Sequence, residues 1–328
     1  MLQPYIENLT DQDDLHVFRS VIIIFRCALP VLSSLHSGFL SAVQQSLLKN
    51  LSRLPPLVCK PLAIIPYLIT NTLAYQELRE VVACLWTISG ILRNTDRLVR
   101  VTISCLTNIL KSKGKTIETD VEANRLVRTL HILGLFGKHC QFEDKIGMFQ
   151  TAFPKWKPGT VSGLITDTII PFCDPAAHTL VRKAALESLC HVCQTHASQF
   201  LRTEILKSFD QVFEVGKKEL VNLVLLGIRT FLQSEENRSE GFASEEKDEK
   251  KNGEPQVERL SRTANANQND GVSTSLAQKY LKNIIQVATS TQDIYALTAT
   301  EVIGSILRQG LVHPKEVRRS IPSLKGLT

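Results

Sequence analysis

Two short clusters in this sequence carry side chains that metal and phosphate chemistry use. The first is Cys190-His-Val-Cys193 with His196 close behind, which has the ligand spacing of half a zinc site. A second pair of cysteines or histidines in a matching loop context is missing from the sequence. In a helix, Cys190 and Cys193 share one face with the apolar side chain of Leu186. The sequence therefore favours two packed thiols over a metal site.

Lys111, Lys113 and Lys115 form the second cluster, in a glycine-containing segment between two apolar stretches. The run Gly114-Lys115-Thr116 has the ending of a phosphate-binding loop, but Ile109 occupies the position where that motif needs its first glycine. The motif also needs a preceding strand, whereas the pattern here predicts a helix. We interpret the three lysines as a turn between helices that contacts phosphate groups, with simple solvation as the alternative.

A second basic pair and two acid–arginine pairs recur at similar places in the pattern. Lys217-Lys218 is expected at a turn between helices, where it serves either as a phosphate contact or as a solvated face. Asp96 with Arg100, and Asp174 with Arg182, follow one sequence phrase. In a stacked array, the aspartate of one repeat can receive the arginine of the next as a structural ladder. DNA contact by Arg100 or Arg182 is the alternative.

The elements that position these residues are predicted to be helices. Apolar residues recur at helical spacing throughout, and alternation of the strand type is hard to find. The phrase that begins at Asp96 returns at Asp174 and, more weakly, at Asp293. A helix pair that cannot close its own core must stack on neighbouring pairs. The sequence therefore predicts an all-α fold, an α-solenoid of HEAT-type helix pairs.

Composition divides the chain into four segments. We expect a HEAT-repeat array over residues 1–233, a disordered charged insertion over 234–271, a continuation of the array over 272–316, and an irregular tail over 317–328. The insertion is expected because residues 234–271 contain few apolar side chains and many Glu, Lys, Ser and Asn residues. The tail looks truncated, since a stacked array usually ends in a polar-faced cap.

Charge and cysteine content restrict the class of protein. The net charge of +6 is a mild basic bias, which suits nucleic acid or an acidic partner. The eight cysteines are dispersed among apolar stripes, which favours a reducing compartment over a disulfide framework. A signal peptide and a stretch long enough to span a bilayer are both missing from the sequence. Known catalytic motifs are also missing, so we expect neither enzyme activity nor a cofactor or metal.

Several segments resemble one family. Val272 to Lys282 follows the charged stretch, and Ala296 to Ile303 leads into Gln309-Gly-Leu-Val-His-Pro314. Leu126 to His139 and Val221 to Gln233 add to the likeness. In this order the segments resemble the C-terminal region of Nipped-B-type sister chromatid cohesion proteins, the large subunit of the cohesin loader. The likeness is strongest near Gly310.

The resemblance implies a hook-shaped HEAT-repeat scaffold in the nucleus, without an active site of its own. It implies that the protein helps to place the SMC–kleisin ring of cohesin on chromatin, contacts double-stranded DNA without sequence preference, and stimulates the ATPase of the ring. Family members are far longer, and the segment that holds their small tetratricopeptide-repeat partner is expected to be absent here.

Two alternatives to a cohesin-loading scaffold stay open. One is a generic HEAT-repeat adaptor or transport scaffold that binds only proteins. The other is an enzyme with an unrecognised site between helices. For the scaffold, we expect DNA contacts at the basic turns, through Lys111, Lys113, Lys115, Lys217 and Lys218.

Overall fold

Side chains at the helix ends explain where several helices begin and stop. Thr119 Oγ1 accepts a hydrogen bond from Glu122 N at 3.3 Å, and the Asp293 carboxylate accepts from Tyr295 N at 3.0 Å. These caps satisfy backbone N–H groups that lack a partner within the helix. Gly216 and Gly310 both have φ of +66°, a left-handed conformation that commonly follows a helix and favours glycine.

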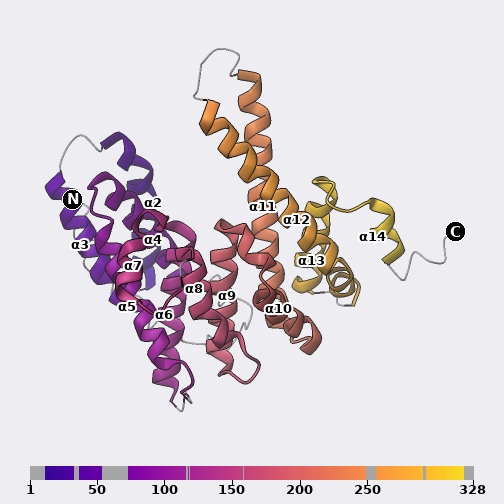
Figure 1. Ribbon diagram of the computed structural model, residues 1–328, viewed down its shortest axis with the longest axis horizontal. Coiled ribbons are helices and arrows are strands. Elements are labelled where there is room, and N and C mark those ends of the chain that lie inside the picture. Colours follow the sequence, from indigo (N-terminus) through magenta and orange to yellow (C-terminus); the bar gives the residue numbers. More distant parts are fainter. Residues whose placement is uncertain are drawn as a thin grey trace. The chain divides into compact units, whose positions relative to one another are not determined.

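A computed structural model of the protein describes residues 12–32, 37–53, 73–115, 117, 119–157, 159–248, 256–290 and 293–320. Throughout these ranges the regular elements are α-helices and short 3₁₀-helices, without a strand (Figure 1). The chain divides into two units, Met1–Ser188 and Leu189–Thr328, and the division falls inside helix α9. The prediction of an all-α fold is confirmed.

The first unit consists of antiparallel helix pairs and short connecting helices. Its elements are α2 (Gln12–Leu32), α3 (Ser37–Arg53), α4 (Leu73–Ile91), α5 (Asp96–Ser112), α6 (Asp120–His139), η2 (Glu143–Lys145), α7 (Ile146–Ala152), α8 (Val161–Ile169), η3 (Ile170–Cys173) and α9 (Thr179–Thr195). Helix α4 packs on α2, α3 and α6, and α5 packs on α6 and α8. Apolar side chains at helical spacing, among them Leu78, Val82 and Leu85 of α4, are fully buried in these contacts.

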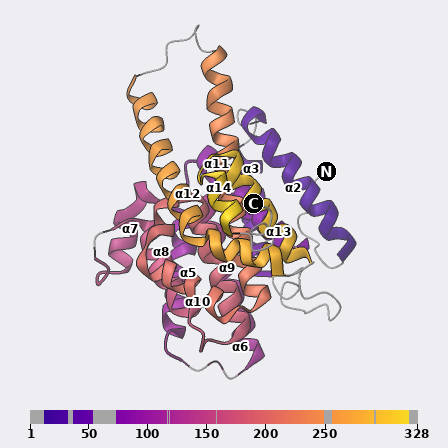
Figure 2. The ribbon, with the colours of Figure 1, turned by 90° about the vertical axis from the view of Figure 1, so that its right-hand side faces the viewer.

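The second unit repeats the same kind of packing. Its elements are η4 (Ala197–Leu201), α10 (Thr203–Val215), α11 (Lys218–Asp248), α12 (Gln256–Ser290), α13 (Ile294–Arg308) and α14 (Pro314–Ser320). Helix α13 packs on both α11 and α12, which lie side by side in two views (Figures 1 and 2). Tyr280 of α12 is buried against Phe209 and Phe213, and its hydroxyl donates a hydrogen bond to Asp210 Oδ1 at 2.9 Å.

The structure differs from the predicted disordered insertion over residues 234–271. Helix α11 continues to Asp248 and α12 begins at Gln256, so the described residues of this segment are helical. Residues 249–255 lie outside the described ranges. The predicted irregular tail over 317–328 is likewise helical up to Ser320, and residues 321–328 lie outside the description. The other predicted segment boundaries stay predictions.

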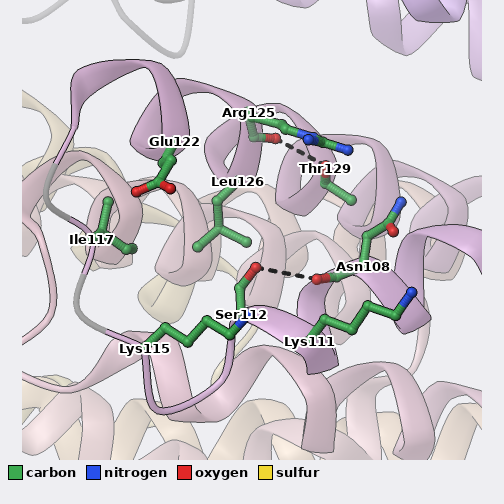
Figure 3. A pocket seen from close by; sticks show the side chains of 9 residues that line it. All are labelled: Asn108, Lys111, Ser112, Lys115, Ile117, Glu122, Arg125, Leu126 and Thr129. Atoms are coloured by element: carbon green, nitrogen blue, oxygen red, sulfur yellow. Dashed lines mark hydrogen bonds between the residues drawn. The ribbon is translucent and has the colours of Figure 1, made fainter.

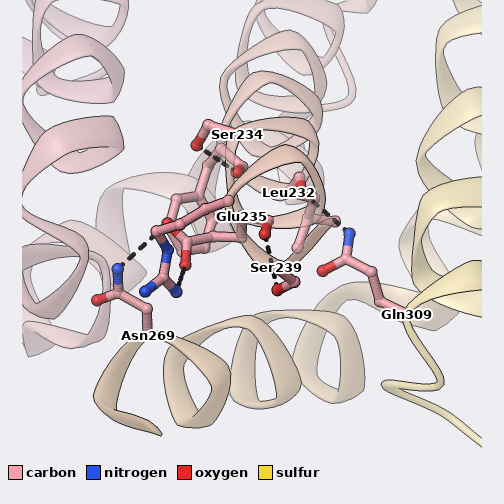
Figure 4. Close-up of polar contacts among 8 residues, drawn as sticks. Leu232, Ser234, Glu235, Ser239, Asn269 and Gln309 are labelled. Atoms are coloured by element: carbon pink, nitrogen blue, oxygen red, sulfur yellow. Dashed lines mark hydrogen bonds and ion pairs between the residues drawn. The ribbon is translucent and has the colours of Figure 1, made fainter. Parts of the chain in front are cut away.

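Contacts between helices explain why a polar sequence is ordered at the start of this segment. Glu235 is buried, and its carboxylate accepts hydrogen bonds from Arg238 and, at 3.1 Å, from Asn269 of α12 (Figure 4). The next residue, Glu236, accepts from Arg308 Nε of α13 at 2.6 Å. The composition predicts that Glu235 and Glu236 are solvated. The structure instead pairs their carboxylates with side chains of α11, α12 and α13, and these pairs compensate for the loss of hydration.

Burial displaces the pKa values of three side chains on α4 and α6. It raises the pKa of Glu77 to about 8, against the opposing effect of Arg19. It lowers the pKa of Lys138 to about 8 and that of His139 to about 4, and Arg79 adds to both effects. In each case burial disfavours the charged form of the side chain.

We expect the free energy of unfolding to fall as the pH rises from about 6.5 to about 8, by up to about 1.4 kcal/mol per pH unit. The pKa of Glu77 is raised from 4.5 to about 8 on folding, so the folded chain holds an extra proton between these values. Its contribution is complete below pH 4.5 and is lost as the pH rises through about 8. Below pH 6.5, the lowered pKa of His139 acts in the opposite direction.

Urea denaturation at several pH values measures this slope. The Glu77→Gln variant is expected to flatten it, because glutamine mimics the neutral carboxyl group. Glu214→Gln, at an exposed position of α10, is the control and should leave the slope unchanged. An unaltered slope in the Glu77→Gln protein would contradict the assignment.

Candidate functional site

The turn between α5 and α6 brings the three predicted lysines together. Helix α5 ends at Ser112, and Gly114 takes φ of +76°, which turns the chain towards α6. Lys111, Lys113 and Lys115 are all exposed. Thr116, the last residue of the motif discussed above, lies outside the described residues. The arrangement presents three ammonium groups along one short stretch of surface.

A pocket of about 270 Å³ opens beside this turn. Its lining consists of Asn108, Lys111, Ser112, Lys115, Ile117, Glu122, Arg125, Leu126 and Thr129 (Figure 3). Two of the three predicted lysines thus face the pocket, whereas Lys113 is not part of its lining. The lysines come from α5 and the following turn, and Arg125 comes from α6.

Sequence reasoning missed the α6 side of this pocket. Glu122, Arg125 and Thr129 follow one another at spacings of three and four residues, so they share one face of α6. That spacing was a usable signal, but it does not reveal what the face lies against. Only the packing of α6 on α5 places Arg125 near Lys111 and Lys115.

Lys217 and Lys218 lie at the turn between α10 and α11, in the second unit. Both are exposed, but Lys218 Nζ lies 3.3 Å from Asp293 Oδ2, the carboxylate that caps α13. An ion pair partly neutralises the field of a lysine, so Lys218 offers less to a phosphate than Lys217 does. The two lysines of this turn therefore differ in how much of their positive charge is already compensated by a carboxylate.

The predicted acid–arginine pairs have partners that the repeated phrase did not anticipate. Asp96 Oδ1 lies 2.8 Å from Lys145 Nζ, and this contact lowers the pKa of Asp96 more than Arg100 does. Asp174 Oδ1 accepts a hydrogen bond from Ala176 N at 2.8 Å, which closes a local turn. Arg182 is buried and donates from Nε to the carbonyl oxygen of Cys173 at 3.1 Å. These contacts are structural, and a ladder between repeats stays a prediction.

Cys190 and Cys193 are both buried in α9, at 3% and 0% exposure. Cys190 lies close to α11, since a Cβ built at Gly227 would come within 2.6 Å of its sulfur. The described residues contain no group of three or more His, Cys, Asp or Glu side chains arranged to hold a metal ion. Among the described helices, none has the length and apolar content that a membrane span requires.

The sequence is similar to known sister chromatid cohesion proteins. Residues 273–325 match the family model described as sister chromatid cohesion C-terminus. Sister chromatid cohesion protein mis4 of Schizosaccharomyces pombe is 22% identical over 347 residues and aligns with 99% of the chain. Nipped-B-like protein of Homo sapiens is 23% identical over 329 residues and aligns with 95% of it. The chain spans 20% of the length of the first relative and 10% of the second.

The fold is also similar to that of a cohesion protein. The C-terminal fragment of the cohesin loader SCC2 from Chaetomium thermophilum superposes with a TM-score of 0.77, at 33% sequence identity. The match covers 99% of this chain and 22% of that one. Of the segments that carried the resemblance in the sequence, those between Val272 and Pro314 fall almost entirely within the matched family region. Leu126 to His139 and Val221 to Gln233 lie outside it.

Proposed function

Because residues 273–325 match the family model of the sister chromatid cohesion C-terminus and the chain resembles longer cohesion proteins along nearly its whole length, we propose that it is a Nipped-B-type protein and a non-enzymatic scaffold of the cohesin-loading complex. In this role it helps to place the SMC–kleisin ring of cohesin on chromatin in the nucleus. The observation that carries the proposal is the likeness, over 99% of the chain, to the C-terminal fragment of a cohesin loader.

The proposal includes contact with double-stranded DNA at the basic turns. Lys111, Lys113 and Lys115 extend from one turn, and Lys217 and Lys218 from another. Exposed ammonium groups on inter-helix turns can approach backbone phosphates without reading the bases. Their binding releases condensed counterions, so the affinity depends steeply on salt and little on sequence.

Replacement of all five lysines by glutamate is expected to weaken binding to duplex DNA and to flatten its salt dependence. Each phosphate contact that is lost reduces the slope of log K against log salt by about 0.9. Lys218 should contribute least, because Asp293 already holds it. Fluorescence anisotropy with one labelled duplex at several salt concentrations measures both quantities.

A matched control carries the same change in net charge at exposed lysines away from these turns, namely Lys155, Lys157, Lys207, Lys282 and Lys315. This variant should keep most of the salt slope. Equal losses in the two variants would mean that net charge alone attracts DNA, and the basic turns would no longer be the proposed contact.

The partner proposal needs its own experiment. The tagged chain is used to capture proteins from nuclear extract, and bound SMC and kleisin subunits are identified by mass spectrometry. Enrichment of cohesin subunits supports the loading role. Enrichment of unrelated transport or signalling complexes instead would favour a generic HEAT-repeat adaptor.

A further inference from the structure

The pocket between α5 and α6 has an excess of positive charge, and one of its cations, Arg125, is not part of the DNA proposal. Three cationic side chains, Lys111, Lys115 and Arg125, line it together with one acidic residue, Glu122. The cations come from two different elements, so the fold itself brings them around one cavity (Figure 3). A ligand with two negative charges would balance this lining.

The remaining lining residues suit a small anionic group that is attached to a carbon chain. Ser112 and Thr129 already donate their hydroxyl protons to the carbonyl oxygens of Asn108 and Arg125, at 3.2 and 2.9 Å. Donors for an anion are therefore the lysines, the arginine and the side-chain amide of Asn108. Ile117 and Leu126 add apolar surface that a carbon chain next to the anion can cover.

The start of α6 adds to the favourable field. Helix α6 is 20 residues long and begins at Asp120, two positions before Glu122 of the pocket lining. The N-terminal end of a helix carries partial positive charge, which favours an anion nearby. Asp120 and Glu122, both in the first turn of α6, act in the opposite direction and repel any anion, so the three cations of the lining have to outweigh them.

We propose that this pocket binds a phosphate monoester, the group found on phosphorylated serine and threonine side chains. A monoester carries close to two negative charges at neutral pH and has three oxygens that accept hydrogen bonds. Arg125 provides planar paired donors for two of these oxygens, and the two lysines balance the charge. A DNA phosphodiester carries one charge and is bound to sugar on both sides, so it matches this lining less well. The site shares Lys111 and Lys115 with the proposed DNA surface, but it depends on Arg125.

Fluorescence anisotropy with three labelled peptides tests the proposal. The peptides have the same uncharged sequence around a central phosphoserine, aspartate or serine. We expect the phosphoserine peptide to bind most tightly, and its affinity to fall as the pH drops below about 6, where a phosphate monoester loses its second charge. The charged side chains that line the pocket around the ligand are Lys111, Lys115, Arg125 and Glu122.

Two variants separate this site from the DNA surface. Arg125→Gln is expected to lower the affinity for the phosphoserine peptide by about tenfold. The affinity for duplex DNA should stay within about twofold of the original value. Lys113 lies on the same turn but outside the lining, so Lys113→Gln should lower the affinity for DNA and leave the affinity for the peptide unchanged. Arg125 is exposed, so both variants are expected to fold, which circular dichroism checks.

Free O-phosphoserine distinguishes the source of the ligand. If it competes at concentrations similar to the peptide, the pocket takes a small free monoester, and if it competes only weakly, the phosphorylated chain supplies further contacts. Either result supports the proposal. Equal binding of the serine and phosphoserine peptides would overturn it. Equal loss of DNA and peptide binding in Arg125→Gln would also overturn it, because the pocket would then bind the DNA backbone.

Discussion

Replacement of Gly134 by alanine is expected to lower the free energy of unfolding of the first unit by about 3 kcal/mol. A Cβ atom built at Gly134 of α6 would lie 2.6 Å from both Cα and Cβ of Ser188 in α9. One of these atoms belongs to the backbone, so the two helices would have to move apart. Packed helices resist such movement because their interiors have few voids to relax into.

The sign of this effect is informative. Alanine is a better helix former than glycine, and at an unobstructed helical position the same change stabilises a protein by about 0.5–1 kcal/mol. Gly90 of α4 is such a position, since nothing lies within 4 Å of its added Cβ. Gly90→Ala is therefore the matched control, and chemical denaturation should move the two variants in opposite directions.

A second substitution locates the clash. Ser188→Gly removes the side-chain atoms nearest to Gly134 but leaves the Cα atom at 2.6 Å. In the Gly134→Ala background it should restore only part of the lost stability. The interpretation fails if Gly134→Ala proves as stable as the original chain, because the two helices would then not approach so closely.

Loss of the carboxylate in Glu187→Met is expected to destabilise the same unit by about 3 kcal/mol. His131 Nε2 of α6 lies 3.4 Å from Glu187 Oε2 of α9, and both side chains are less than 10% exposed. Removal of one member of a buried polar pair takes away a contact that offsets the desolvation of the other, which is the costly part of such a change.

A double-mutant cycle measures this coupling. His131→Leu alone should be at least as damaging as Glu187→Met, since it leaves a buried carboxylate without its histidine. The double variant should lose clearly less stability than the sum of the single variants, because two apolar side chains replace both polar groups. Simple additivity would show that the two residues act independently, against the proximity that the structure gives them.

Both predictions concern the helix that supplies the α6 side of the pocket. Glu122, Arg125 and Thr129 lie in its first half, and His131 and Gly134 lie further along it. Ser188 also donates a hydrogen bond to the carbonyl oxygen of Leu130 at 2.9 Å. The contacts with α9 therefore hold α6 in the orientation that presents Arg125 to the lysines of the neighbouring turn.

The fold class followed from the sequence because helical periodicity is a local property. Apolar residues at spacings of three and four, such as Leu78, Val82 and Leu85, mark a buried face whatever that face packs against. Helix ends at Gly216 and Gly310 could be predicted for the same reason, since backbone conformation limits the residue type. The family resemblance also rested on short local segments, and the comparisons bear it out.

The order of residues 234–239 could not be predicted, because it depends on contacts with distant residues. Composition alone predicts that the side chains of Glu235 and Glu236 are exposed to solvent. The structure pairs them with Arg238, with Asn269 of α12 and with Arg308 of α13. Charges that are paired and hydrogen-bonded can be buried, and single-sequence patterns do not reveal which charges will find such partners.

By itself, the sequence determined the helical architecture, the family resemblance, and the turns at which Lys111, Lys113, Lys115, Lys217 and Lys218 lie. Tertiary structure alone decided which of these lysines share a pocket with Arg125 and which, like Lys218, are already paired. The physical reason is that the two kinds of interaction act over different distances along the chain. Periodicity and turn chemistry act over a few residues, whereas a binding pocket requires side chains on separate helices to converge, and helix packing sets that convergence.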